Sequence, residues 1–178
     1  MSIRYFVYFI LSSCLILYGA SPTFSANYDL ITDFGTSADM ISIGNIQGFS
    51  DSSSAIFDNP AALHTIKTFS MDVFSSTVFT EVTYQTISLA FPLLKGTVGL
   101  GYMSSGVEDI PVTYLDGNGF VQTNTSFSVK SSVGKLAYSF PVTFPLVSNS
   151  YLALGASYYS NQIHTTQGVG WSTDLGIY

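Results

Sequence analysis

The strongest constraint in this sequence is an alternation of side chains with a period of two. The clearest example covers residues 168–178. Its apolar side chains fall on one side of an extended chain and its small or polar ones on the other: Val169, Trp171, Leu175 and Ile177 against Gly170, Ser172, Asp174 and Gly176. This period is typical of β-strands that turn one face to an apolar phase. The sequence therefore predicts an all-β fold.

Five further segments bring the expected strands to six, each of about the 9–11 residues that a tilted strand needs to cross a bilayer. One segment begins at Phe69, and the other four cover residues 82–93, 96–103, 135–140 and 151–159. Tight connections are expected at residues 92–95 and 141–149, and a long polar loop at residues 104–130. Within that loop, residues 116–119 (Asp-Gly-Asn-Gly) are a strong turn signal and favour a small hairpin. Short turns on one side and long loops on the other are typical of outer-membrane barrels.

The shortage of charge supports a membrane location. Charged residues make up 9% of the chain, against roughly 25% in an ordinary soluble domain. A soluble β-sandwich also alternates, but it normally carries many more charges on its outward face. With one arginine, Arg4, and a net charge of −6, the chain has no basic stripe that could bind nucleic acid.

The first 25 residues have the pattern of a secretory signal peptide. A positive start at Arg4 is followed by an apolar run over residues 5–17, and then by small and polar residues. Residues 11–14 (Leu-Ser-Ser-Cys) are similar to a lipobox, but the apolar run continues beyond Cys14 and favours ordinary cleavage. Once Cys14 is removed, no cysteine remains for a disulfide, a thiol nucleophile or a thiolate metal site.

No pattern in the sequence indicates catalysis. Nucleophile motifs, phosphate-binding loops and zinc spacings are missing, and His64 and His164 lie far apart. The acids Glu108, Asp109 and Asp116 do not follow a calcium-loop spacing. We therefore expect a protein that is not an enzyme and has no cofactor and no metal site. Asp174 is the polar residue that the alternation places on the inner side of the last strand.

The segment before the first strand carries a resemblance to a known family. It contains Gly35, Ala38 and Asp51, and then residues 55–63 (Ala-Ile-Phe-Asp-Asn-Pro-Ala-Ala-Leu). This pattern resembles the FadL-like outer-membrane proteins, most closely the PorV/PorQ group, in which an Asn-Pro-Ala motif leads into the barrel. Ser37 stands at the usual arginine of that pattern, and Asp58 stands where an aromatic residue is common.

The resemblance implies a transmembrane antiparallel β-barrel of about 14 strands, of which about six are present here, with an N-terminal plug or hatch in the lumen. We accordingly divide the chain into a signal peptide (1–25), a plug segment with the Asn-Pro-Ala motif (26–66) and the N-terminal part of the barrel (67–178). Six strands cannot close such a barrel, and an open edge in lipid leaves unpaired backbone groups. We therefore expect a truncated barrel.

The motif Asn59-Pro60-Ala61 has a physical interpretation of its own. Pro60 lacks a backbone donor and biases Asn59 away from the helical region, while the Asn59 amide can bond to nearby backbone. We expect a rigid turn that leads into a strand and positions the plug against the wall. Direct contact of the motif with a ligand is the alternative.

The sequence thus favours an outer-membrane protein of a Gram-negative-type bacterium. By resemblance, its role is either type IX protein secretion, as for PorV/PorQ, or uptake of hydrophobic molecules, as for FadL. The expected partners are outer-membrane lipid and either secretion-apparatus proteins or a hydrophobic small molecule. The alternative is a secreted or surface β-sheet protein with a structural or adhesive role and no transport activity.

Overall fold

The computed structural model describes residues 35–178 apart from residues 45, 47, 79–80 and 145–146. The predicted signal peptide with Cys14, and the part of the predicted plug segment before residue 35, lie outside the described residues. Most of the described chain is antiparallel β-sheet. The predicted all-β fold class is therefore confirmed.

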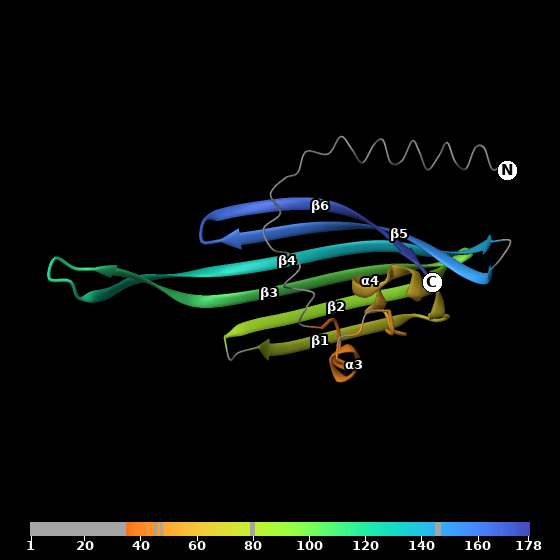
Figure 1. Ribbon diagram of the computed structural model, residues 1–178, viewed down its shortest axis with the longest axis horizontal. Helices are drawn as coiled ribbons and strands as arrows, with labels where there is room; N and C mark the ends of the chain where they lie inside the picture. Colours follow the sequence, from red (N-terminus) through yellow and green to blue (C-terminus); the bar gives the residue numbers. More distant parts are fainter. Residues whose placement is uncertain (1–34, 45, 47, 79–80, 145–146) are drawn as a thin grey trace.

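Six strands form one sheet, and their order in the sheet is their order in the chain (Figure 1). They are β1 (Ser70–Val78), β2 (Val82–Leu93), β3 (Gly96–Leu115), β4 (Val121–Phe144), β5 (Val147–Ile163) and β6 (Thr166–Ile177). Each strand is antiparallel to the next. Within the described residues β1 and β6 are edge strands that do not pair with each other, so the sheet is not closed.

All six expected strands are present, but the connections differ from the expectation. The predicted loop at residues 104–130 is mostly strand, because β3 and β4 continue into it as a long hairpin that projects beyond the other strands (Figure 1). The turn falls at the predicted place, where the Asp116 carboxylate accepts hydrogen bonds from the backbone N–H groups of Asn118 and Phe120. The stretch 141–149, predicted as a turn, is also largely strand, since β4 reaches Phe144 and β5 begins at Val147.

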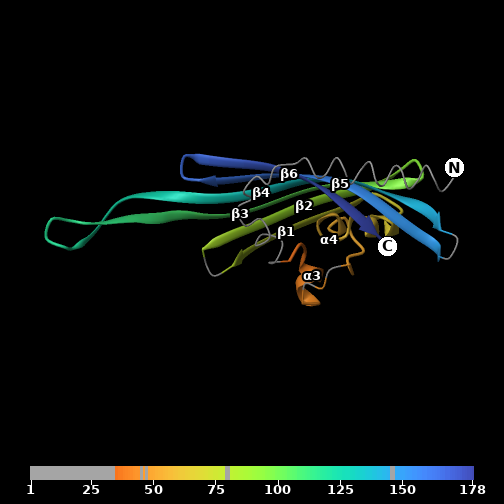
Figure 2. The ribbon, with the colours of Figure 1, turned by 45° about the horizontal axis from the view of Figure 1, so that its top comes forward.

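Three short helices lie on one side of the sheet: α3 (Ala38–Ser42), α4 (Ala55–Asp58) and the 3₁₀-helix η1 (Pro60–Thr65) (Figure 2). The Ser37 side chain caps α3 by accepting a hydrogen bond from the backbone N–H of Met40. We call α4 and η1 together the helical segment. The sheet face that it contacts is the covered face, and the opposite face is the open face.

The covered face has a floor of small residues, which lets the helical segment approach the sheet backbone. A Cβ atom on Gly99 would lie 2.6 Å from Leu63 Cδ1, and one on Gly101 would lie 2.8 Å from the ring of Phe57. Ile56, Phe57 and Leu63 are consequently buried in one apolar cluster with residues of β2, β3 and β4. The core of the described chain therefore lies between the helical segment and the sheet.

Hydroxyl groups of the sheet fix the backbone of the region before β1. Ser139 Oγ donates to the carbonyl of Ala61 at 3.0 Å, and Thr86 Oγ1 donates to the carbonyl of Thr36 at 2.9 Å. Short helices leave several carbonyls without an intrahelical partner, and a buried carbonyl of this kind needs a donor from elsewhere. Serine and threonine on the covered face supply such donors without the bulk of larger side chains.

The contact at Gly176 yields a test of this packing. A Cβ atom there would lie 2.7 Å from Asn59 Oδ1 and 3.0 Å from the backbone N of Ala61. We expect Gly176→Ala to lower the free energy of unfolding by about 1–3 kcal/mol, as overpacking does in other cores. Gly134→Ala is the matched control, because a Cβ atom on Gly134 meets no atom within 4 Å. Denaturant unfolding of both variants gives the comparison, and equal midpoints would contradict the packing described.

Candidate functional site

The strand register divides the open face into rows that run across the sheet. Each row consists of residues opposite one another on successive strands, and successive rows are two residues apart along each strand. The first two rows are Phe140, Leu152 and Ile177 (row 1), and Phe91, Val98, Tyr138, Leu154 and Leu175 (row 2). The next two are Met71, Leu89, Leu100, Leu136, Ala156 and Thr173 (row 3), and Val73, Ile87, Tyr102, Gly134, Tyr158 and Trp171 (row 4).

Beyond row 4 the character of the open face changes abruptly. Row 5 contains Ser75, Gln85, Ser104, Ser132, Ser160 and Val169, and row 6 contains Thr77, Thr83, Gly106, Lys130, Gln162 and Gln167. Rows 1 to 4 are thus apolar apart from Thr173 and Gly134, whereas rows 5 and 6 are polar apart from Val169 and Gly106. We call rows 1 to 4 the apolar band.

The apolar band is exposed. Leu154 on β5 is 59% accessible, and Leu175 and Trp171 on β6 are 71% and 76% accessible. From row 1 to row 4 the chain advances six residues along β4, from Phe140 to Gly134, which is about 20 Å at roughly 3.3 Å per residue. The side chains of the outermost rows lengthen the band at both ends, so it is similar in size to the roughly 25 Å apolar belt of outer-membrane barrels.

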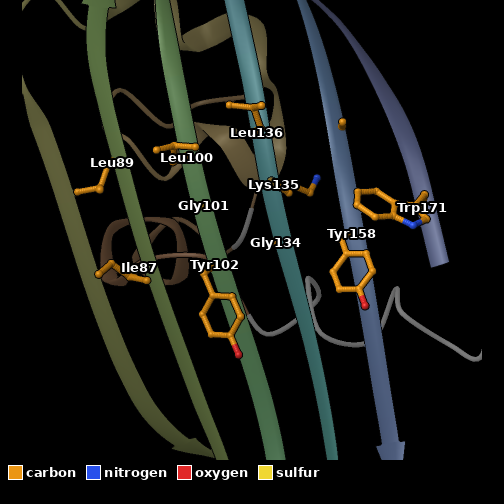
Figure 3. A pocket seen from close by; sticks show the side chains of 11 residues that line it. Ile87, Leu89, Leu100, Gly101, Tyr102, Gly134, Lys135, Leu136, Tyr158 and Trp171 are labelled. Atoms are coloured by element: carbon orange, nitrogen blue, oxygen red, sulfur yellow. The ribbon is translucent and has the colours of Figure 1, made fainter. Parts of the chain in front are cut away.

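An aromatic groove lies where the apolar band meets the polar rows. It has a volume of about 420 Å³, and Gly134 lies on its floor. Tyr102 and Tyr158 stand on either side of Gly134, with their hydroxyl groups directed towards rows 5 and 6 (Figure 3). Trp171 is packed beside Tyr158, with ring centroids 4.6 Å apart. Aromatic side chains with an apolar body and a polar tip are typical of a boundary between an apolar phase and water.

The ion pair of Lys135 and Asp174 on the covered face links β4, β6 and α4. Lys135 Nζ on β4 lies 3.4 Å from a carboxylate oxygen of Asp174 on β6, and also donates to the carbonyl of Phe57 in α4 at 3.4 Å. Ser157 Oγ on β5 donates to the same carboxylate at 2.7 Å. Asp174, the polar residue singled out from the sequence, therefore lies on the face that carries the helical segment. Lys135 was not predicted as a site residue, although the alternation of β4 places it on that face.

Asp58, at the end of α4, is a second acid near this group. Thr36 Oγ1 donates to its carboxylate at 3.3 Å. Burial raises the pKa of Asp58 to about 6, while the hydrogen bond from Thr36 and the charge of Lys135 act in the opposite direction. The Asp58 carboxyl is thus a group of the helical segment whose charge changes near pH 6, while burial lowers the pKa of the other titratable side chain of this segment, His64, below its usual range.

The Asn59-Pro60-Ala61 motif fastens the helical segment to the last strand. The Asn59 side chain accepts from the backbone N–H of Ala61 at 3.1 Å, and its amide donates to the carbonyl of Ile177 on β6 at 3.1 Å. Pro60 is the first residue of η1, a position where its missing N–H and fixed φ fit a helix start. The motif therefore begins a 3₁₀-helix that is followed by β1, where the sequence predicted a rigid turn that leads into a strand.

Within the described residues, no group of three histidine, cysteine or acidic side chains is placed to hold a metal ion. Among the same residues, no helix has the length and apolar character needed to cross a membrane. No family model matches the chain, and neither a curated protein nor a solved structure matches it.

The raised pKa of Asp58 predicts a pH dependence of stability. The folded protein keeps the Asp58 proton at pH values where the unfolded chain has lost it, so folding is progressively disfavoured as the pH rises from about 4 to 6. We expect the stability of the wild type to fall over this range and that of Asp58→Asn to change less with pH. Unfolding midpoints measured between pH 4 and pH 7 give both curves. Superimposable curves for the two proteins would contradict the assignment.

The ion pair of Lys135 and Asp174 predicts that substitutions at these two positions have non-additive effects on the free energy of unfolding. Lys135→Met leaves the Asp174 carboxylate without its counter-charge. Because this pair keeps some contact with solvent, we expect a cost of about 1–3 kcal/mol, below the roughly 3–5 kcal/mol of a fully buried pair. The double variant Lys135→Met with Asp174→Asn should be more stable than Lys135→Met alone. A double-mutant cycle measures the coupling, and strictly additive losses would show that the two side chains do not interact.

Proposed function

We propose that this chain forms part of the wall of an outer-membrane β-barrel that serves transport across the membrane. The observation that carries the proposal is the banding of the open face. Rows 1 to 4 are apolar, row 4 contains the aromatic residues Tyr102, Tyr158 and Trp171, and rows 5 and 6 are polar. A strand that faces lipid needs an apolar side chain at every second position across the hydrocarbon, and an aromatic girdle where the hydrocarbon meets the headgroups. Both features follow here from the strand register.

In this proposal, further strands complete the sheet. An unpaired strand edge within lipid exposes backbone N–H and C=O groups that have no water to bond, and each such group costs several kcal/mol. The edges of β1 and β6 must therefore pair in the membrane. The resemblance of the region before β1 to the FadL-like proteins implies closure as a barrel of about 14 strands.

The helical segment would then occupy the lumen as a plug. Its contacts with the wall support this role, because they combine small-residue packing with polar bonds that can exchange with water. The ion pair of Lys135 and Asp174 contacts the carbonyl of Phe57, and Asn59 contacts the end of β6. Displacing the plug would break these polar bonds and uncover the apolar cluster that Ile56, Phe57 and Leu63 form with Tyr84, Met103 and Val133 of the wall.

The resemblance offers two transport roles. In a PorV/PorQ-like role, the barrel escorts secreted proteins at the cell surface as part of a type IX secretion apparatus. In a FadL-like role, a hydrophobic molecule enters and the plug moves to open a route. A strain that lacks the protein distinguishes them: loss of exported surface proteins with normal fatty-acid uptake indicates the first role, and the reverse result indicates the second.

A soluble structural or adhesive protein is the alternative class. A β-sandwich buries its apolar face against a second sheet, whereas within the described residues the apolar band is covered by neither a sheet nor a helix. Covering the band would require a partner along its whole length. The membrane provides such a partner without any further protein.

The single tryptophan of the chain tests the membrane location. Trp171 lies in row 4, at the edge of the apolar band. In vesicles whose acyl chains carry bromine at defined depths, we expect Trp171 fluorescence to be quenched most strongly by bromine near the headgroups. In a Trp171→Phe protein with Leu154→Trp, which places the indole in row 2, the strongest quenching should come from deeper bromine. A protein that stays soluble, with both indoles unaffected by any brominated lipid, would refute the proposal.

A further inference from the structure

Two hollows follow one another on the open face. The first is the aromatic groove over Gly134 in the apolar band. The second is a polar hollow of about 280 Å³ over β2, β3 and β4, whose lining includes Gln85, Ser104, Gly106, Glu108 and Lys130. Their linings come from adjoining rows of the same strands, since Tyr102 and Gly134 are in row 4, Ser104 is in row 5, and Gly106 and Lys130 are in row 6.

The strand register places the two hollows in line along β4. Lys130, Ser132, Gly134 and Leu136 occupy successive positions of the open face on this strand. Opposite Lys130 is Gly106, where an added Cβ atom would lie 3.9 Å from Lys130 Cγ. The missing side chain leaves space beside the lysine stem. Between the hollows, the hydroxyl groups of Tyr102 and Tyr158 are directed towards the polar end (Figure 3).

The charges of the polar hollow balance. Lys130 supplies one positive charge and Glu108 one negative charge. Of the other lysines in the described chain, Lys135 pairs with Asp174 on the covered face. Lys67 and Lys95 line a different hollow near the β2–β3 turn, at the opposite end of the apolar band. The polar hollow therefore suits a headgroup that carries both an anionic and a cationic group.

We infer that the polar hollow and the aromatic groove together bind one molecule of a zwitterionic phospholipid with a primary ammonium group. Lys130 would face the phosphate, Glu108 would accept hydrogen bonds from the ammonium, and an acyl chain would lie along β4 over Gly134 towards Leu136. Each end of this amphiphile meets a surface of matching polarity. The inference rests on the proposed membrane location, and it adds a specific lipid site on the outside of the wall.

A competition between brominated lipids tests the site, because Trp171 lines the aromatic groove. The full-length protein is reconstituted in phosphatidylcholine vesicles that contain a small fraction of phosphatidylethanolamine or phosphatidylglycerol with identical brominated chains. At equal mole fraction, we expect brominated phosphatidylethanolamine to quench Trp171 fluorescence about threefold more strongly than brominated phosphatidylglycerol does. A ratio of this size is what a partly exposed charge interaction gives. Lys130→Gln and Glu108→Gln should each abolish the difference.

Matched variants separate the site from general effects. Gly134→Leu fills the floor of the aromatic groove at a position with open space, and it should reduce the preference without loss of folding. Lys95→Gln removes an exposed lysine at the β2–β3 turn, and Val73→Leu enlarges a side chain in row 4 on β1. Both controls should keep the wild-type preference.

The outcomes distinguish this inference from the proposed function. Equal quenching by the two brominated lipids, or stronger quenching by phosphatidylglycerol, would overturn the lipid site while leaving the membrane location intact. A loss of preference in Lys95→Gln as large as that in Lys130→Gln would also overturn the lipid site. Absence of quenching by every brominated lipid would instead overturn the membrane location itself.

Discussion

The register between the strands determines what each face of this sheet can do. Side chains alternate between the two faces of a sheet, so a slip of one residue in a single strand would turn its apolar side chains towards the helical segment. In the observed register, Leu100, Leu136 and Ala156 lie in one row of the open face, while Gly99, Ala137 and Gly155 lie opposite one another on the covered face. The apolar band and the small-residue floor are therefore two consequences of one arrangement.

This distribution of side chains is the opposite of that in a soluble sheet. A soluble sheet buries its large apolar side chains and exposes its polar ones. Here most of the large apolar side chains are exposed, and the buried face consists mainly of glycine, alanine, serine and threonine, with Tyr84, Met103, Val133 and the pair Lys135 and Asp174 among them. The floor stays shallow enough for α4 and η1 to contact it, and the polar groups of the floor bond to backbone carbonyls of the region before β1. Packing on one face and exposure on the other thus support the same proposal of a membrane wall with a plug.

The sequence predicted the six strands and the two faces, because alternation is a local property that can be read within one segment. It did not predict the continuation of β3 and β4 through residues 104–130, where the polar composition resembled that of a loop. The pair of Lys135 and Asp174 was not predicted either, since these residues lie on strands separated by β5 and meet only when the register is known. The bond from Asn59 to the carbonyl of Ile177 spans 118 residues, and no local signal could have indicated it.

Nitroxide labels along β5 would provide the sharpest test of the membrane wall. Single labels at positions 152–160 of the reconstituted protein report access to oxygen, which concentrates in lipid, and to a polar nickel complex, which stays in water. A membrane wall at this face of β5 predicts high oxygen access at positions 152, 154, 156 and 158, a change to nickel access at position 160, and low access to both reagents at positions 153, 155 and 157. Nickel access at every open-face position, from 152 to 160, would contradict it.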